Sequence, residues 1–203
     1  AFTGTHVMVE STPNTNITFT NSKFELTSAG NLSNNFYANA PESLTFTNNA
    51  VDATGYTGAM FQPVGDANDP MHTTVTFTGN TFTGQAGTYV SGDDNDVPLI
   101  INLSDVNGTV SNNTFDNVDI GVLVANGSGP LEIEGNTFEH MHRVDGSTAG
   151  GSAAGVVFFQ PDFNDKIDVH NNTFSDSDSG VRTSGVPNTT TGGQNIVIDS
   201  NNF

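Results

Sequence analysis

The side chains that could carry out acid–base chemistry lie between residues 132 and 168. Glu132 and Glu134 are followed by His140 and Arg143, and Asp168 occupies an equivalent position further along the chain. Two carboxylates with a histidine can act as general acid and base on a glycosidic bond. If the protein is an enzyme, these five residues are the predicted catalytic set. A solvated acidic face without a catalytic role is the alternative that we favour, because abstraction of a proton from an acidic sugar typically needs a basic residue and Arg143 is the only candidate nearby.

A second group of acidic residues occupies residues 92–96. Asp93, Asp94 and Asp96 form a dense run of oxygen ligands, which are the donors that Ca²⁺ prefers. The run lacks the spaced ligands and the distal glutamate of an EF-hand, so an exposed acidic turn is the other interpretation. Ca²⁺ is the one candidate cofactor.

The residues that would position these groups follow a pattern that is clearest in residues 131–138. Leu131 and Ile133 alternate with two glutamates, which is the period-2 pattern of a half-buried strand. Gly135 and Asn136 tolerate the left-handed backbone region that a sharp corner needs. Phe138 then turns inward, so the segment predicts a strand, a corner and a second short strand.

The same pattern occurs seven times, with apolar residues at i and i+2, usually Asn at i+5, and Phe or Val at i+7. Successive copies are separated by 27, 31, 33, 23, 36 and 29 residues. A constant pattern with variable spacing predicts a solenoid of about seven coils that carries loops of different length. The copies are residues 17–24, 44–51, 75–82, 108–115, 131–138, 167–174 and 196–203.

Stacked coils would place the corner asparagines above one another, and the closing aromatic residues likewise. Each buried amide could then bond to the next coil, and the aromatic rings could stack along the axis. We assign both columns a structural role. The predicted ladder consists of Asn49, Asn80, Asn113, Asn136, Asn172 and Asn201.

The outward positions of the first strand form another column, which begins with four rows of threonine and serine and continues with acidic residues. The upper rows, such as Thr45/Thr47 and Thr76/Thr78, resemble the flat faces of solenoid antifreeze proteins. They predict an ice- or glycan-binding face, although threonine is also an ordinary surface residue of strands.

Composition excludes several classes of partner. Four basic and 22 acidic residues give a net charge of −18, so the protein cannot neutralise phosphate, and we expect neither nucleic-acid binding nor binding to anionic membranes. No apolar run is long enough for membrane insertion. The absence of cysteine excludes disulfides, and the Asn-, Thr- and Gly-rich composition suggests an extracellular or cell-surface location.

The run from Val169 through Asn172 and Phe174 to Gly180 and Val181 resembles the coil of right-handed parallel β-helices. These include pectate-lyase-like proteins and periplasmic β-helix-repeat proteins. The resemblance covers nearly the whole chain and implies an all-β fold with a single β-helix domain over residues 1–203. It does not fix a function, because this fold carries lyases, hydrolases, epimerases, adhesins and filament subunits. In the polysaccharide enzymes of the fold, the outward strand face usually carries the substrate groove.

The two ends of the chain have matching phase and show no capping segment, which predicts head-to-tail stacking or a fragment of a longer β-helix. We therefore expect a non-enzymatic, extracellular subunit of a filament or an adhesive stalk, whose main partner is another copy of itself. A carbohydrate-active enzyme is the second hypothesis, and an ice- or glycan-binding module is the third. The predicted assembly residues are Phe2, Val7, Val9, Ile196, Ile198 and Phe203.

Overall fold

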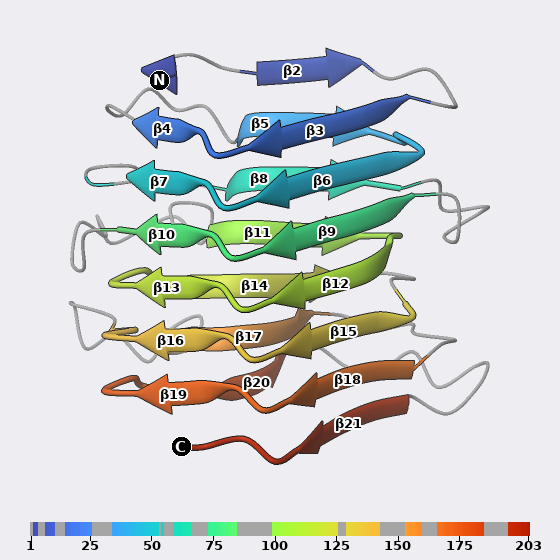
Figure 1. Cartoon of the computed structure of the whole chain (residues 1–203). Coiled ribbons are helices and arrows are strands. Elements are labelled where there is room, and N and C mark those ends of the chain that lie inside the picture. Colours follow the sequence, from blue (N-terminus) through green and yellow to red (C-terminus); the bar gives the residue numbers. More distant parts are fainter. Residues whose placement is uncertain are drawn as a thin grey trace.

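All the regular secondary structure in the described part of the chain is β-strand (Figure 1). The computed structural model describes residues 2–3, 7–10, 15–25, 34–52, 54, 59–65, 73–84, 99–125, 129–142, 153–159, 166–184 and 195–203. Within those ranges, no helix is long and apolar enough to cross a membrane.

The strands form three parallel sheets of seven strands each. Sheet 1 contains β3 (Asn16–Thr20), β6 (Ser43–Thr47), β9 (Thr74–Thr78), β12 (Asn107–Ser111), β15 (Leu131–Glu134), β18 (Lys166–His170) and β21 (Asn195–Asp199). Sheet 2 contains the short strands β1 (Phe2–Thr3), β4 (Lys23–Glu25), β7 (Ala50–Asp52), β10 (Thr81–Thr83), β13 (Thr114–Asp116), β16 (Thr137–Glu139) and β19 (Thr173–Ser175). Sheet 3 contains β2 (Val7–Glu10), β5 (Asn34–Asn39), β8 (Ala59–Val64), β11 (Leu99–Ser104), β14 (Ile120–Ala125), β17 (Ala154–Phe159) and β20 (Val181–Ser184).

The chain visits the three sheets in turn, so each strand pairs with the strands three places before and after it. In Figure 1 the strands of sheets 1 and 2 cross the front from right to left, and those of sheet 3 return behind them while the chain descends. This path is a right-handed coil, the hand that parallel crossover connections favour. The prediction of an all-β parallel solenoid is confirmed.

The alternation that predicts these strands matches their burial. In β15, Leu131 and Ile133 are buried, while Glu132 is exposed and Glu134 is half-buried. In β6 the same pattern buries Leu44 and Phe46. Inward residues from all three sheets form a continuous apolar core that follows the coil axis.

The corner between sheets 1 and 2 depends on one left-handed residue in each coil. That residue directly precedes the ladder asparagine, as Gly135 (φ +61°) precedes Asn136 and Asn112 (φ +54°) precedes Asn113. Glycine and asparagine enter this backbone region at low cost, and they fill most of these positions. The first residue of the corner therefore makes the bend, which leaves the second free to point inward.

The asparagine ladder is confirmed, and it bonds to the coils on both sides. The Asn136 backbone N–H and side-chain Nδ2 donate to Asn172 Oδ1 at 2.9 and 3.0 Å. Asn136 Nδ2 also donates to the Val110 carbonyl at 2.8 Å. Equivalent bonds join Asn49, Asn80, Asn113, Asn136, Asn172 and Asn201 in sequence. Each amide thus satisfies backbone groups at the corner, where the strand pairing is interrupted.

The aromatic column is also confirmed in the C-terminal half of the solenoid. From Phe82 through Phe115, Phe138 and Phe174 to Phe203, neighbouring ring centroids lie 4.8–5.1 Å apart with interplanar angles of 6–10°. Val51 interrupts the column near the N-terminal end, where aromatic rings such as Phe46 and Phe61 pack at tilted angles instead.

Glycines next to the start of the third strand in several coils make room for these rings. A Cβ atom at Gly155 would lie 2.5 Å from Phe174 Cε1, and one at Gly180 would lie 2.4 Å from Phe203 Cε1. A side chain at either position would displace the ring of the following coil. The Gly-Val segments of the sequence therefore serve the aromatic column as well as sheet 3.

Replacing Asn113 with alanine should lower the free energy of unfolding by about 2–4 kcal/mol. The substitution removes the acceptor of the Asn80 N–H and Nδ2 groups and the donor to the Phe77 carbonyl. Urea unfolding followed by far-UV circular dichroism would measure the change. The control is Thr109→Ala, on the outward face of the preceding strand, which should stay within about 0.5 kcal/mol of the wild type. Equal midpoints for the two variants would contradict a stabilising ladder.

Candidate functional site

The outward face of sheet 1 gathers the polar side chains that the sequence analysis singles out. The strands pair in register, so that Thr76 lies opposite Thr109, Thr109 opposite Glu132, and Glu132 opposite Asp168. The parallel column contains Thr78, Ser111, Glu134, His170 and Asp199. The face is therefore rich in hydroxyl groups on its N-terminal rows and acidic on its C-terminal rows.

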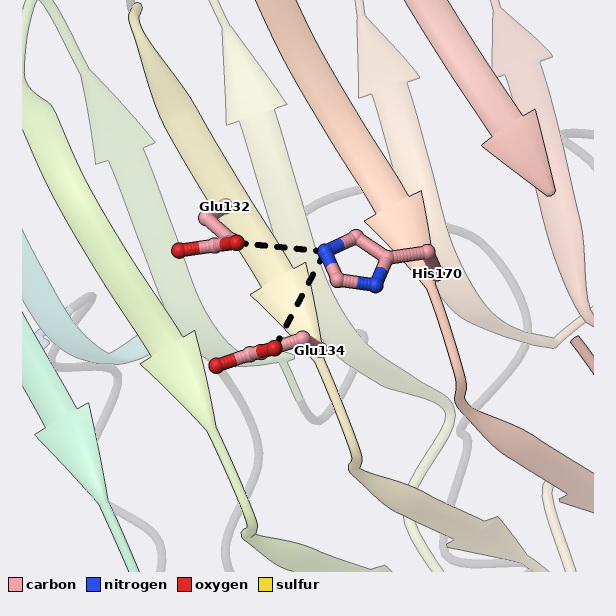
Figure 2. A group of neighbouring side chains, drawn as sticks. All are labelled: Glu132, Glu134 and His170. Carbon is pink, nitrogen blue, oxygen red and sulfur yellow. Dashed lines mark hydrogen bonds and ion pairs between the residues drawn. The ribbon is translucent and has the colours of Figure 1, made fainter. Parts of the chain in front are cut away.

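Glu132, Glu134 and His170 form a close cluster on this face (Figure 2). His170 Nε2 lies 3.2 Å from Glu132 Oε1 and 3.9 Å from Glu134 Oε2. One donor atom from each residue lies within 4.8 Å of the other two. Two carboxylates on β15 thus flank the imidazole that β18 contributes.

The neighbours of this cluster hold the imidazole and occupy the nearby lysine. Asn171 Nδ2 lies 2.9 Å from His170 Nδ1, so the second ring nitrogen also has a polar partner. Lys166 Nζ lies 2.7 Å from Asp168 Oδ2, on the strand that carries His170. The His170 side chain is 23% exposed, compared with 50% for the Glu132 side chain. The imidazole is therefore the best-packed member of the cluster.

The predicted catalytic residues fall into three groups. Glu132, Glu134 and Asp168 share the outward face of sheet 1. His140 lies after β16, where its Nδ1 atom is 2.8 Å from Asp116 Oδ1. The imidazole that contacts Glu132 is instead that of His170. Arg143 lies outside the described residues, as do the predicted calcium ligands Asp93, Asp94 and Asp96.

The predicted catalytic set omits His170, although the sequence carries a signal for it. His170 follows Asp168 by two residues, so both project from the same face of β18. The repeat register places His170 opposite Glu134. The sequence predicts His140 because it follows the glutamates closely, but the corner at residue 135 carries the chain onto another sheet.

A second cluster beyond sheet 2 joins two histidines of one coil to aspartates of the coils before and after it. His140 bonds to Asp116 at 2.8 Å, and its Nε2 atom lies 3.9 Å from Asp176. His142 lies 3.2 Å from Asp176 and 3.1 Å from Asp178. The cluster is largely exposed and links the ends of β13, β16 and β19.

Both histidines in this second cluster have a raised pKa. The hydrogen bond to Asp116 raises the pKa of His140 above its ordinary value of 6.5, with further contributions from the charges of Asp116, Glu139 and Asp176. The hydrogen bond to Asp178 raises the pKa of His142, and Asp176 adds to the shift. Protonation of either ring therefore strengthens its contacts with the folded protein.

The cluster of Glu132, Glu134 and His170 and the hydroxyl rows of sheet 1 offer different chemistry. Glu132, Glu134 and His170 provide two oxygen ligands and one nitrogen ligand to a cation, or a pair of carboxylates to a bound sugar. The hydroxyl rows above them offer a regular array of hydrogen-bonding groups, for which ice or glycan binding stays a prediction.

The chain matches no protein-family model, no curated protein and no solved structure. Its function is therefore inferred from its own geometry.

The protein should become more resistant to heat as the pH falls from 8 to 6. The folded-state pKa of His140 and of His142 is raised, so the stabilisation is fully present below the unfolded-state pKa and is lost as the pH rises through the folded-state pKa. Differential scanning calorimetry would measure Tm at each pH. Because a smaller negative net charge also stabilises at low pH, the comparison is with the double variant His140→Gln and His142→Gln. That variant should show a smaller change in Tm, and an unchanged pH dependence would contradict this role.

Proposed function

We propose that this protein is a structural β-solenoid of an extracellular or cell-surface assembly, in which copies stack head to tail into a filament or an adhesive stalk. The observation that carries the proposal is the exposure of apolar side chains at the β21 edge of the solenoid. Ile198 is 45% exposed and Phe203 is 72% exposed, whereas the equivalent Val169 and Phe174 of the preceding coil are 0% and 5% exposed. The column positions that are buried inside the solenoid are thus presented at this edge.

The hydrogen-bonding groups at the same edge are also arranged for another coil. Asn201 accepts bonds from the Asn172 backbone and side chain and donates to the Val169 carbonyl. Inside the solenoid, the next asparagine supplies the acceptor for the equivalent backbone N–H. A parallel strand with asparagine in the same register would continue both the ladder and sheet 1. A further coil of the same polypeptide would fit this edge as well as a second copy would; the proposal concerns the second copy.

The sheet order defines how a second copy would have to join. After β20 and β21, its β2 and β3 would extend sheets 3 and 1. The next position in sheet 2 is already taken, because Asn202 pairs with Thr173 there, and the β1 strand of the second copy belongs to that same sheet. A junction that continues all three sheets therefore requires either Asn202 of the first copy or β1 of the second copy to leave this position.

Electrostatics sets the conditions for such a stack. Each copy carries a net charge of −18, so stacked copies repel one another at low ionic strength. At 0.1 M salt, repulsion between charges more than about 10 Å apart is largely screened. Assembly by this route should therefore depend strongly on salt.

The three-sheet architecture also supports a relationship to the pectate-lyase-like β-helix proteins. Within that group a second function is favoured by one observation: Glu132 and Glu134 flank an imidazole on the outward face of sheet 1. A pair of carboxylates in such a position could protonate a glycosidic oxygen and stabilise the resulting cationic centre. Polysaccharide cleavage at this face is the alternative to a purely structural role.

Negative-stain electron microscopy of the purified protein should show filaments at 0.3 M salt and few at 0.02 M. Ile198→Lys places a charge on the exposed apolar position and should abolish the filaments. Val197→Lys is the matched control, because it adds the same charge to the outward column of the same strand. Isolated short rods of wild type at every salt and protein concentration would reject head-to-tail stacking.

A variant without residues 1–3 tests the junction itself. It removes the β1 strand that competes with Asn202, so it should assemble at a lower protein concentration than the full chain. If the variant loses assembly while the full chain retains it, then β1 is needed at the contact and the junction described above is wrong.

If the outward face of sheet 1 cleaves polysaccharide, Glu132→Gln and Glu134→Gln should each reduce the rate at least 100-fold, because each removes a carboxylate that the reaction would need. Release of reducing ends from a panel of neutral and uronic-acid polysaccharides would measure the rate. Asp199→Asn is the control, since it removes a carboxylate from the next row of the same face. Absence of release by the wild type across the panel would leave the structural role.

A further inference from the structure

We propose that Glu132, Glu134 and His170 bind a divalent transition-metal ion, with Zn²⁺ as the best match. The site lies on the outward face of sheet 1 and is independent of the stacking proposed above. Figure 2 shows the three side chains converging from two neighbouring strands.

Two of the three separations between the ligand atoms approach those around a bound ion, and all three atoms lie within 4.8 Å of one another. Zn²⁺ binds nitrogen and oxygen ligands at about 2.0–2.1 Å, which places tetrahedral ligands about 3.3 Å apart. His170 Nε2 is 3.2 Å from Glu132 Oε1 and 3.9 Å from Glu134 Oε2. Small side-chain rotations would therefore bring all three atoms onto one ion.

The backbone fixes the strands that carry these ligands before an ion arrives. β15 and β18 pair in parallel, with Glu134 opposite His170 and Glu132 opposite Asp168. The ladder bond between Asn136 and Asn172 follows directly after both strands and holds the same register. A site built on two paired strands loses little backbone entropy on binding.

The imidazole distinguishes this cluster from an ordinary acidic surface. Two glutamates alone would offer only oxygen, which hard ions such as Ca²⁺ and Mg²⁺ prefer. A histidine nitrogen shifts the preference toward Zn²⁺ and other first-row transition metals. The nearby lysine, Lys166, is paired with Asp168, so its charge is directed to that carboxylate.

Asn171 provides the supporting contact that a histidine ligand needs. Its side-chain amide lies 2.9 Å from His170 Nδ1. Rotation of the amide by half a turn would present its oxygen to Nδ1–H and leave the Nε2 lone pair for the ion. Three protein ligands also leave a fourth position for water or for an oxygen of a ligand. The site therefore has the composition of an open metal centre.

Isothermal titration calorimetry of the full 203-residue chain with ZnCl₂ tests the proposal. Wild type should bind one ion at this site, and CaCl₂ should bind at least tenfold more weakly because of the nitrogen ligand. His170→Ala and the isosteric Glu134→Gln should each weaken Zn²⁺ binding at least tenfold, and Asn171→Ala should weaken it to a smaller extent. Circular dichroism would confirm that each variant is folded.

The second histidine cluster supplies the matched control. Among the described residues, His140 and His142 are the two other histidines that lie beside carboxylates. The double variant His140→Gln and His142→Gln removes both and should leave the proposed site intact. Zn²⁺ should also shift the ring-proton NMR signals of His170. The proposal is overturned if the wild type shows no saturable binding, if His170→Ala binds as tightly as the wild type, or if binding is lost in the double variant instead.

Discussion

The in-register stacking of parallel strands, held at one corner by buried asparagine amides, is the constraint on which the rest of this structure depends. A solenoid coil has no hydrophobic core of its own, so it is stable only when its neighbours cover its two open sides. The corner between sheets 1 and 2 interrupts the strand pairing and would leave polar backbone groups buried. Each ladder asparagine, such as Asn136, bonds to the coil before it and to the coil after it, and so removes that cost.

A fixed interior leaves the outward positions free to vary. Sheet 1 shows this most clearly, because its outer columns change from threonine to glutamate, aspartate and histidine while the inward residues remain apolar. Residues far apart in sequence thus become neighbours with regular spacing. The contact between Glu132 and His170, which are 38 residues apart, follows from this register. The outward face can acquire a chemical site without any change in the core.

The high negative charge gives the histidines particular importance. The protein contains 22 acidic and four basic residues, so many carboxylates have no lysine or arginine partner. In two places, histidine lies beside carboxylates of a neighbouring coil. At one of them, Asp116 and Asp178 raise the pKa values of His140 and His142, so those rings gain charge readily. At the other, His170 lies between two glutamates in the arrangement that we propose for a metal ion.

The sequence by itself determined the repeat, the strands of sheet 1, the asparagine ladder and the pairing of the outward columns. It could do so because period-2 alternation and a glycine or asparagine corner are local features, and parallel stacking simply repeats them. It also indicated that Glu132, Glu134 and Asp168 share one face. Only the tertiary structure decided that His170, and not His140, joins the glutamates, because the left-handed corner at Gly135 sends the next segment onto another sheet. The role of Gly155 likewise became clear only in three dimensions, since the ring of Phe174 that occupies its space comes from the following coil.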